Sequence, residues 1–177
     1  MLVSLLLFFS IAAFWGCKKV VEKLFTGFDL TLTGIPTVIS QIPVSYYPFS
    51  LSTTIKFNLD SIVKAESRGS YGGEDLKSVK VKQATLRLQH ADSSTYMGLL
   101  HSVSIQLYSD TIPTPVTLVT ANVPDTATTT LHFDASHSPE ILPYLQGRNI
   151  TYRVIVVTRR PIMRNFVAAT DIVLAIK

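Results

Sequence analysis

Apolar and polar residues alternate with a period of two along most of the chain from Phe28 onward. The alternation is clearest in four segments, at residues 28–33, 51–59, 103–108 and 130–134. Successive side chains of a strand point to opposite faces, so this period predicts strands with one buried and one wet face. Strands of this kind are typical of antiparallel sheets.

The segment 79–88 keeps this period but changes its phase. Val79 and Val81 are apolar at odd positions, whereas Leu86 and Leu88 are apolar at even positions. One extra residue restores the register, so we expect a β-bulge or a bend near Gln83–Ala84.

Two later segments, 150–157 and 166–176, are nearly continuous apolar runs. Such runs predict strands that are central in a sheet or covered on both faces. The stretch Ile35–Phe49 holds three prolines. It predicts an extended edge segment, since proline cannot donate a hydrogen bond within a central ladder.

Helix signals are few. Asp60 is expected to cap a short helix that ends near Gly69. Ser138–Pro139 is expected to begin a second helix that ends at Gly147, and Pro143 limits it to about two turns. Between these helices, the Gly-rich loop Ser67–Asp75 is expected to be the most flexible interior stretch.

These elements predict an all-β fold over residues 28–177. Strands separated by turn signals every ten to fifteen residues or so favour an antiparallel β-sandwich of about seven to nine strands. One or two short helices complete it. We expect a single domain with no internal repeat.

The first sixteen residues, MLVSLLLFFSIAAFWG, contain no charged side chain. This run is shorter than the roughly 20 residues that span a bilayer as a helix. It fits the hydrophobic region and cleavage site of a secretory signal peptide. An uncleaved N-terminal anchor and a buried segment are the two alternatives.

The residues Phe14-Trp15-Gly16-Cys17 resemble the lipobox of bacterial lipoproteins, and the chain resembles a small lipoprotein of Bacteroidota type. Gly16 and Cys17 match the family pattern, while Trp15 stands where the family prefers a smaller residue. The resemblance implies a signal peptide over 1–16, lipidation of Cys17, and a lipidated tether over 17–27. The body only generally resembles immunoglobulin-like or late-embryogenesis-abundant-like sandwiches.

The residues after Cys17 bear on the address that this resemblance implies. In such lipoproteins an Asp immediately after the cysteine tends to retain the protein in the inner membrane, and none stands there. Lys18 and Lys19 stand where surface-exported lipoproteins often carry acidic residues. The resemblance therefore implies the periplasmic face of the outer membrane, with the lipid as the contact to the membrane. Two or more acyl chains hold a protein to a bilayer stably.

Composition removes several classes of protein. The chain has 177 residues, of which 47% are apolar and 16% are charged, with a net charge of +4. A disordered chain would be richer in charge and poorer in apolar residues. A single cysteine excludes an internal disulfide framework and a cysteine-based zinc site.

The basic and aromatic residues predict a binding surface. Such side chains could meet anionic lipid headgroups, an acidic glycan or a partner protein. The alternative is a solvated strand face and a charged hairpin end. No nucleic-acid motif is present, so no nucleic-acid partner is expected. The candidate residues are Lys80, Lys82, Arg87, Arg159, Arg160, Arg164, Tyr46, Tyr47 and Tyr71.

Two threonines are candidate O-glycosylation sites. Thr111 and Thr126 each follow an aspartate and precede a small or aliphatic residue, in segments expected to be loops. This pattern is known from secreted proteins of Bacteroidota.

Candidate catalytic chemistry is sparse. His132, Asp134 and His137 form a weak candidate metal cluster, since a metal site needs three or four converging ligands. No Gly-x-Ser-x-Gly motif occurs in the sequence. We therefore expect no enzyme, no cofactor and no metal, with a small hydrolase or metal-dependent enzyme using that cluster as the alternative.

Together these patterns predict a lipid-anchored protein of the cell envelope. Its expected role is that of a non-catalytic binding or structural module. The expected partner is a protein, a glycan or another envelope component.

Overall fold

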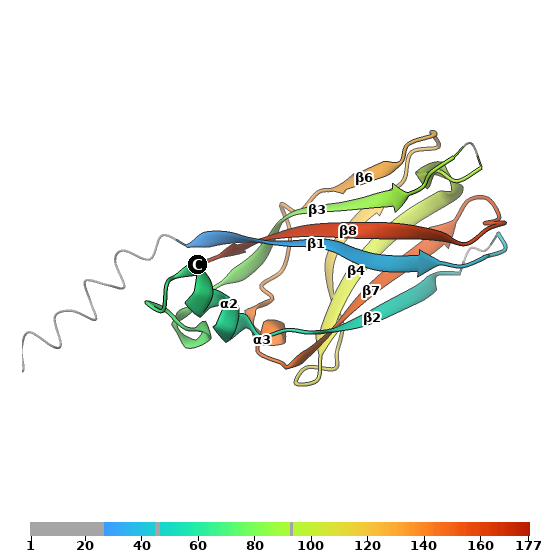
Figure 1. Ribbon diagram of the computed structural model, residues 1–177. Helices are drawn as coiled ribbons and strands as arrows, with labels where there is room; N and C mark the ends of the chain where they lie inside the picture. The colour runs from blue at the N-terminus through green and yellow to red at the C-terminus, as the bar shows by residue number, and fades with distance from the viewer. Residues whose placement is uncertain (1–26, 45–46, 93) are drawn as a thin grey trace, which may run out of the picture.

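A computed structural model describes residues 27–44, 47–92 and 94–177 (Figure 1). The predicted signal peptide, Cys17, almost all of the predicted tether, and Tyr46 lie outside these residues. The elements follow in the order β1 (Phe28–Ile39), β2 (Phe49–Lys56), α2 (Leu59–Glu66), η1 (Gly73–Asp75), β3 (Val79–Gln89), η2 (Met97–Leu99), β4 (Leu100–Ser109), β5 (Val116–Asn122), β6 (Thr130–Phe133), α3 (Leu142–Leu145), β7 (Asn149–Thr158) and β8 (Phe166–Ile176).

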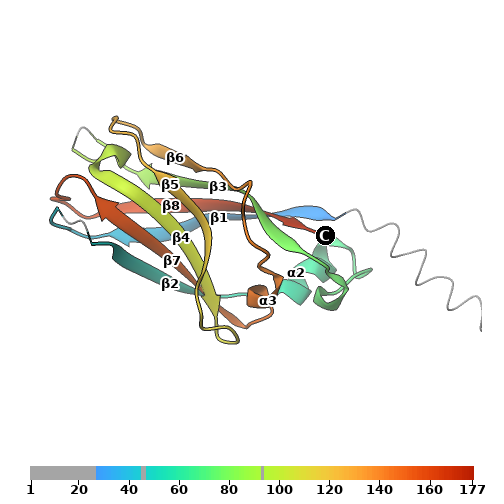
Figure 2. The same cartoon turned by 180° about the vertical axis from the view of Figure 1, so that it is seen from behind.

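The eight strands form two four-stranded sheets packed face to face. One sheet has the order β1-β8-β3-β6 and the other the order β2-β7-β4-β5, and all pairs are antiparallel. Successive strands mostly alternate between the sheets, as in a jelly-roll sandwich. Figure 2 shows the second sheet from its own side. The predicted all-β sandwich with two short helices is confirmed.

The alternation of the sequence corresponds to the inner and outer faces of these sheets. Val103 and Ile105 are fully buried, and Leu131 is 6% exposed. The apolar runs form β7 and β8, which are central in their sheets as predicted. Their outward side chains are half-buried, however, because no further layer covers them.

The phase change within β3 is a register shift between Val81 and Gln83 against β8. The predicted bulge is therefore confirmed, next to the predicted position. A second shift, which the sequence pattern does not predict, lies in β1 between Leu32 and Ile35. There Gly34 has a φ of 68°, a conformation that favours glycine.

The caps of both helices differ from the prediction. Asn58 caps α2, because its Oδ1 accepts a hydrogen bond from Ser61 N at 2.9 Å, and Asp60 lies in the first turn. The second helix covers only Leu142–Leu145, so its predicted start at Ser138 is wrong. The Ser138 hydroxyl instead accepts a hydrogen bond from Val81 N on β3.

The proline-rich stretch is only partly a strand. Its first residues belong to β1, which is an edge strand as predicted, and Pro36 pairs there with Ala169. The rest connects β1 to β2 across the two sheets.

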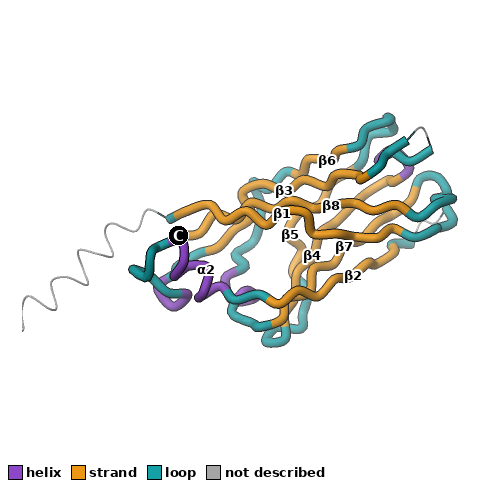
Figure 3. Tube along the Cα trace, in the orientation of Figure 1, coloured by secondary structure: helices purple, strands orange, loops and turns teal. Residues whose placement is uncertain are grey.

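The sandwich has two distinct ends, both visible in Figure 3. At the near end β1 begins at Phe28, opposite Ile176 of β8, so the chain enters the domain beside its C-terminus. Helix α2 also lies at this end (Figure 1). At the far end Ile39 pairs with Phe166, and the β1–β2 and β7–β8 connections lie beyond them.

One buried hydrogen bond joins the two sheets through the core. The Tyr152 hydroxyl on β7 donates to Thr170 Oγ1 on β8 at 2.6 Å. Burial raises the pKa of Tyr152. Across the described ranges, no helix is both long enough and apolar enough to cross a membrane.

Candidate functional site

Large apolar side chains are exposed at the far end of the sandwich. The exposed fractions are 55% for Val38, 50% for Val44, 81% for Tyr47 and 74% for Met163. These four are the exposed large hydrophobic residues within the described part of the chain, and we call them the far-end surface. Exposed apolar groups that gather at one place commonly mark an interaction site.

The backbone beneath the far-end surface is held by a bridge between two loops. Ile42 N donates to Ile162 O at 3.1 Å, and Ile162 N donates to Ile42 O at 2.8 Å. Both isoleucine side chains are buried, at 4% and 2% exposed. Because they point into the core, the loops that carry Val44 and Met163 are fixed in place.

Two side chains extend this connection. Gln41 N donates to Asn165 Oδ1 at 3.0 Å, and the Thr158 hydroxyl donates to Pro43 O at 3.1 Å. A hollow of about 250 Å³ lies beside it, lined by Leu99, Pro161, Ile162, Met163, Arg164 and Phe166 among others. The far end therefore combines a fixed backbone, exposed apolar groups and a shallow hollow.

The predicted arginine patch is mostly engaged within the protein. Arg159 donates to the carbonyl oxygens of Gly98 at 3.1 Å and Val123 at 2.8 Å. Arg160 donates to Asp125 at 2.8 Å and to the Tyr96 hydroxyl at 2.9 Å. The Asp125 carboxylate raises the pKa of Arg160. These two arginines tie the β7–β8 connection to neighbouring loops, while Arg164 lines the hollow.

The basic residues of β3 lie apart from these arginines, on the outer face of the β1-β8-β3-β6 sheet. Lys82 pairs with Asp29 of β1, and Arg87 pairs with Asp171 of β8 at 3.1 Å. Lys80 is exposed on the same strand face. The structure therefore does not join these residues with the arginines of the far-end loops, and two of the three charges are paired.

The two candidate tyrosines within the described residues also lie at different places, one at each end of the sandwich. Tyr47 belongs to the far-end surface, so its predicted exposure is confirmed. Tyr71 is half-buried and packs against the hydrophobic core at the near end. The structure therefore does not bring Tyr71 together with Tyr47, and its candidate role in binding stays a prediction.

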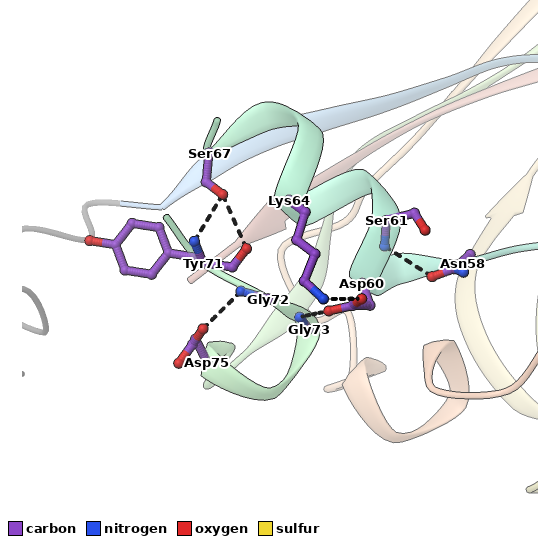
Figure 4. A network of polar contacts seen from close by, with 9 residues as sticks. All are labelled: Asn58, Asp60, Ser61, Lys64, Ser67, Tyr71, Gly72, Gly73 and Asp75. Carbon is purple, nitrogen blue, oxygen red and sulfur yellow. Dashed lines mark hydrogen bonds and ion pairs between the residues drawn. The ribbon is translucent and has the colours of Figure 1, made fainter. Parts of the chain in front are cut away.

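The near end holds a polar network around α2 (Figure 4). Asp60 accepts a hydrogen bond from Lys64 Nζ at 2.8 Å and another from Gly73 N at 2.9 Å. The hydrogen bond from Lys64, followed by that from Gly73, lowers the pKa of Asp60. The Asp60 carboxylate thus connects the loop after α2 to the helix by hydrogen bonds.

The rest of the Gly-rich loop closes on itself. Tyr71 N donates to Ser67 Oγ at 3.0 Å, and Ser67 Oγ donates to Tyr71 O at 3.1 Å. Gly72 N donates to Asp75 Oδ2 at 2.8 Å. A loop that the sequence marked as flexible is thus cross-linked by short-range hydrogen bonds.

An open cleft of about 920 Å³ lies beside this network, between α2 and α3. Its polar lining includes cations and acids together, at Lys56, Asp60, Glu74 and Arg148. The sequence pattern does not predict this cleft, because its walls come from segments far apart in the chain.

The candidate metal residues do not converge. His132 Nδ1 lies 3.4 Å from Thr85 Oγ1, and His137 Nδ1 lies 2.8 Å from Ser136 Oγ. Asp134 accepts a hydrogen bond from Ser136 N, which lowers its pKa. Within the described ranges, no three His, Cys, Asp or Glu side chains are placed to hold a metal ion.

The two candidate glycosylation residues are exposed. Thr111 lies after β4 and its hydroxyl is 2.9 Å from Ser109 Oγ, while Thr126 lies in the β5–β6 loop. Both positions are accessible in the fold, and their modification stays a prediction.

The comparisons with known proteins find likeness of fold. A scan against protein-family models gives no match, and no curated protein matches the sequence. A solved peptide-N(4)-(N-acetyl-beta-D-glucosaminyl) asparagine amidase is 8% identical over 81% of this chain and 42% of its own, with a TM-score of 0.42. N-glycanase F (PNGase F) is 12% identical over 80% and 41%, with a TM-score of 0.42. A chain of the cyanophage Pam1 capsid is 8% identical over 85% and 86%, with a TM-score of 0.40.

These neighbours contradict the expectation that the protein is not an enzyme, because two of them are amidases, and that expectation is withdrawn. This chain spans about two fifths of the length of both amidases. At 8% and 12% identity the likeness concerns the fold alone and assigns no activity.

Proposed function

We propose that this chain is a lipid-anchored protein of the bacterial cell envelope that acts as a binding or structural module. Its partner is a protein that docks on the far-end surface. The observation that carries the proposal is the gathering of Val38, Val44, Tyr47 and Met163 at the end away from the chain entry.

The position of the chain entry supports this arrangement. An acylated Cys17 would precede the sandwich by a short tether, and the sandwich begins at the near end with Phe28. Several acyl chains would hold that end at the periplasmic face of the outer membrane. The far-end surface would then point away from the lipid, toward other envelope components.

The chemistry of the surface favours a protein partner. Tyrosine and methionine are enriched where protein interfaces are fully buried, and charged residues are depleted there. Tyrosine is also among the residues that contribute most to binding energy. Arg164 beside the hollow favours an acidic residue at the rim of the partner's contact.

The anchor is tested by the intact mass of the protein extracted from membranes, beside a Cys17→Ala variant. We expect residues 17–177 plus acyl groups, and loss of both processing and membrane attachment in the variant. A full-length, unmodified chain would overturn the lipid anchor.

The far-end surface is tested by photo-cross-linking in cells, with a photoreactive residue at position 47 or 163. The matched control is position 61, since Ser61 is exposed at the near end. We expect both far-end positions to capture the same protein and position 61 to capture none of it. Equal capture from all three positions, or none from the far end, would contradict the proposal.

A further inference from the structure

The outer face of the β2-β7-β4-β5 sheet is covered by neutral polar side chains. Along β2, β4 and β5 the residues that point away from the core mostly carry a hydroxyl or an amide, whereas the outward residues of β7 are Asn149, Thr151, Arg153, Ile155 and Val157. We call this surface the hydroxyl face. Its members are Ser50, Ser52, Thr54, Ser102, Ser104, Gln106, Tyr108, Thr117, Thr120, Asn122 and Thr151.

The side chains of the hydroxyl face form rows across the strands. Thr54 and Thr151 place their hydroxyl oxygens 3.0 Å apart, and Ser104 and Thr120 do the same at 3.0 Å. Gln106 Nε2 donates to Thr117 Oγ1 at 3.2 Å. Donors and acceptors are thereby held in fixed positions before any ligand arrives, which reduces the entropy lost on binding.

The charged side chains on the strands of this sheet are all positive. Its four strands lie wholly within the described residues and contain no Asp or Glu, while Lys56 and Arg153 are their lysine and arginine residues. The opposite sheet differs, because Lys82 and Arg87 are each paired with a carboxylate there. An anion approaching the hydroxyl face therefore meets no acidic side chain from these strands.

Arg153 lies in the middle of the hydroxyl face. It is paired in register with Ser52 on one side and Gln106 on the other. Its guanidinium lies 4.8 Å from the centre of the Tyr108 ring, a cation–π contact that fixes its direction. Within the described residues no carboxylate forms an ion pair with it, and its Nε is buried without a hydrogen-bond partner.

We propose that the hydroxyl face binds an acidic glycan, a polysaccharide that bears carboxylate groups. A sugar carboxylate would accept charge-assisted hydrogen bonds from the Arg153 guanidinium, which is suited to planar carboxylates. The sugar hydroxyls would exchange hydrogen bonds with the serine, threonine and glutamine side chains in the adjacent rows.

Other classes of ligand fit this surface less well. Nucleic acids and anionic membranes are held by many lysines and arginines, whereas these four strands carry two. The buried centre of a protein interface is apolar and aromatic, whereas this face is mostly hydroxyl and amide. The inference uses neither Cys17 nor the far-end surface, so it does not depend on the proposed function.

The experiment is isothermal titration of the full chain in detergent with polygalacturonate, beside its fully methyl-esterified form. The esterified polymer keeps the sugar hydroxyls but lacks the carboxylate charge. We expect binding to the acidic polymer and at least about tenfold weaker binding to the ester, as for the loss of one charge-assisted contact.

Two variants locate the site. Arg153→Gln is expected to weaken binding about tenfold, whereas Lys80→Gln removes the same charge from the opposite sheet and should leave affinity within about twofold. Thr117→Glu places a carboxylate in the row of Gln106 and Arg153, on an exposed edge strand, and should abolish binding. Thermal unfolding of each variant checks that the fold is intact.

Three results would overturn the proposal. The first is no binding by the unaltered chain, and the second is equal affinity for the acidic and esterified polymers. The third is an equal loss from Arg153→Gln and Lys80→Gln, which would mean attraction by net charge alone.

Discussion

The two ends of the sandwich use opposite chemistry, and neither follows from the composition of its loops. The near-end loop is polar and rich in glycine, yet its groups bond to one another, as Asp60 does to Lys64 and Gly73. The far-end loops carry three arginines beside their apolar residues, yet Tyr47 and Met163 are exposed there while Ile42 and Ile162 hold the backbone. Whether a loop side chain is exposed or engaged thus depends on its neighbours in the fold and not on the composition of the loop.

The same lesson applies to the arginines. Arg159 and Arg160 look like a basic patch in the sequence, but carbonyl oxygens and Asp125 occupy them. Arg153 stands alone in an apolar run of the sequence, and none of the ion pairs among the described residues includes it. Clustering along the chain is therefore a poor guide to available charge.

The largest difference in the free energy of unfolding is expected between substitution of a buried residue at the near end and substitution of an exposed residue at the far end. Leu145 is 3% exposed and lines a small apolar cavity of about 30 Å³ between the sheets. Leu145→Ala should lower the free energy of unfolding by about 2–5 kcal/mol, since it enlarges that cavity. Met163→Ala should change it by less than about 0.5 kcal/mol. Urea unfolding measures both, and a similar loss from each would mean that Met163 packs structurally.

A smaller difference in the free energy of unfolding is expected between substitutions of Arg159 and Arg160, the two arginines that bond to neighbouring loops. Arg159→Met keeps the apolar stem but leaves the Gly98 and Val123 carbonyls without their charged donor, so we expect a loss of about 1–3 kcal/mol. Arg160→Met breaks an ion pair whose partners are 45% and 47% exposed, and should lower the free energy of unfolding by less than Arg159→Met does, because solvent screens the pair. The reverse order in urea unfolding would contradict the assignment of Arg159 as the structural clamp.

The smallest expected effect is a pH dependence at the near end. Because the folded pKa of Asp60 is lowered, its contribution to stability is present above the unfolded pKa of about 3.9 and is lost as pH falls through the folded pKa. Asp60→Asn should therefore have a lower Tm than the unaltered chain at neutral pH, and the gap should close as the pH falls below about 4. A gap that is the same at every pH would mean that the carboxylate charge does not hold the loop.

Much of the fold could be predicted from local pattern. Alternation identified the inward residues of β4 and β6, because the pleat of a strand is fixed by backbone geometry. The phase change located the bulge in β3 within a residue or two. The cap at Asn58 was missed because Asn and Asp cap helices almost equally well and two candidates lie close together.

Ser138 shows where local pattern misleads. Ser-Pro is a good helix start, but the Ser138 hydroxyl is used by β3, and Glu140 accepts hydrogen bonds from Ser78 and Val79. Hydrogen bonds from the start of β3 thus hold this segment outside the helix. The pairing comes from residues about sixty positions away, which no local window contains.

The sequence by itself determined the all-β class and the inward side of most strands, because these depend on neighbouring residues. The tertiary structure alone decided which charges are paired, which apolar side chains are exposed and which cation lies on a neutral face. Those properties depend on contacts between strands that are distant in the chain, as between Arg153, Ser52 and Gln106. Register and sheet order set those contacts, and they arise from burial of the core as a whole rather than from any single segment.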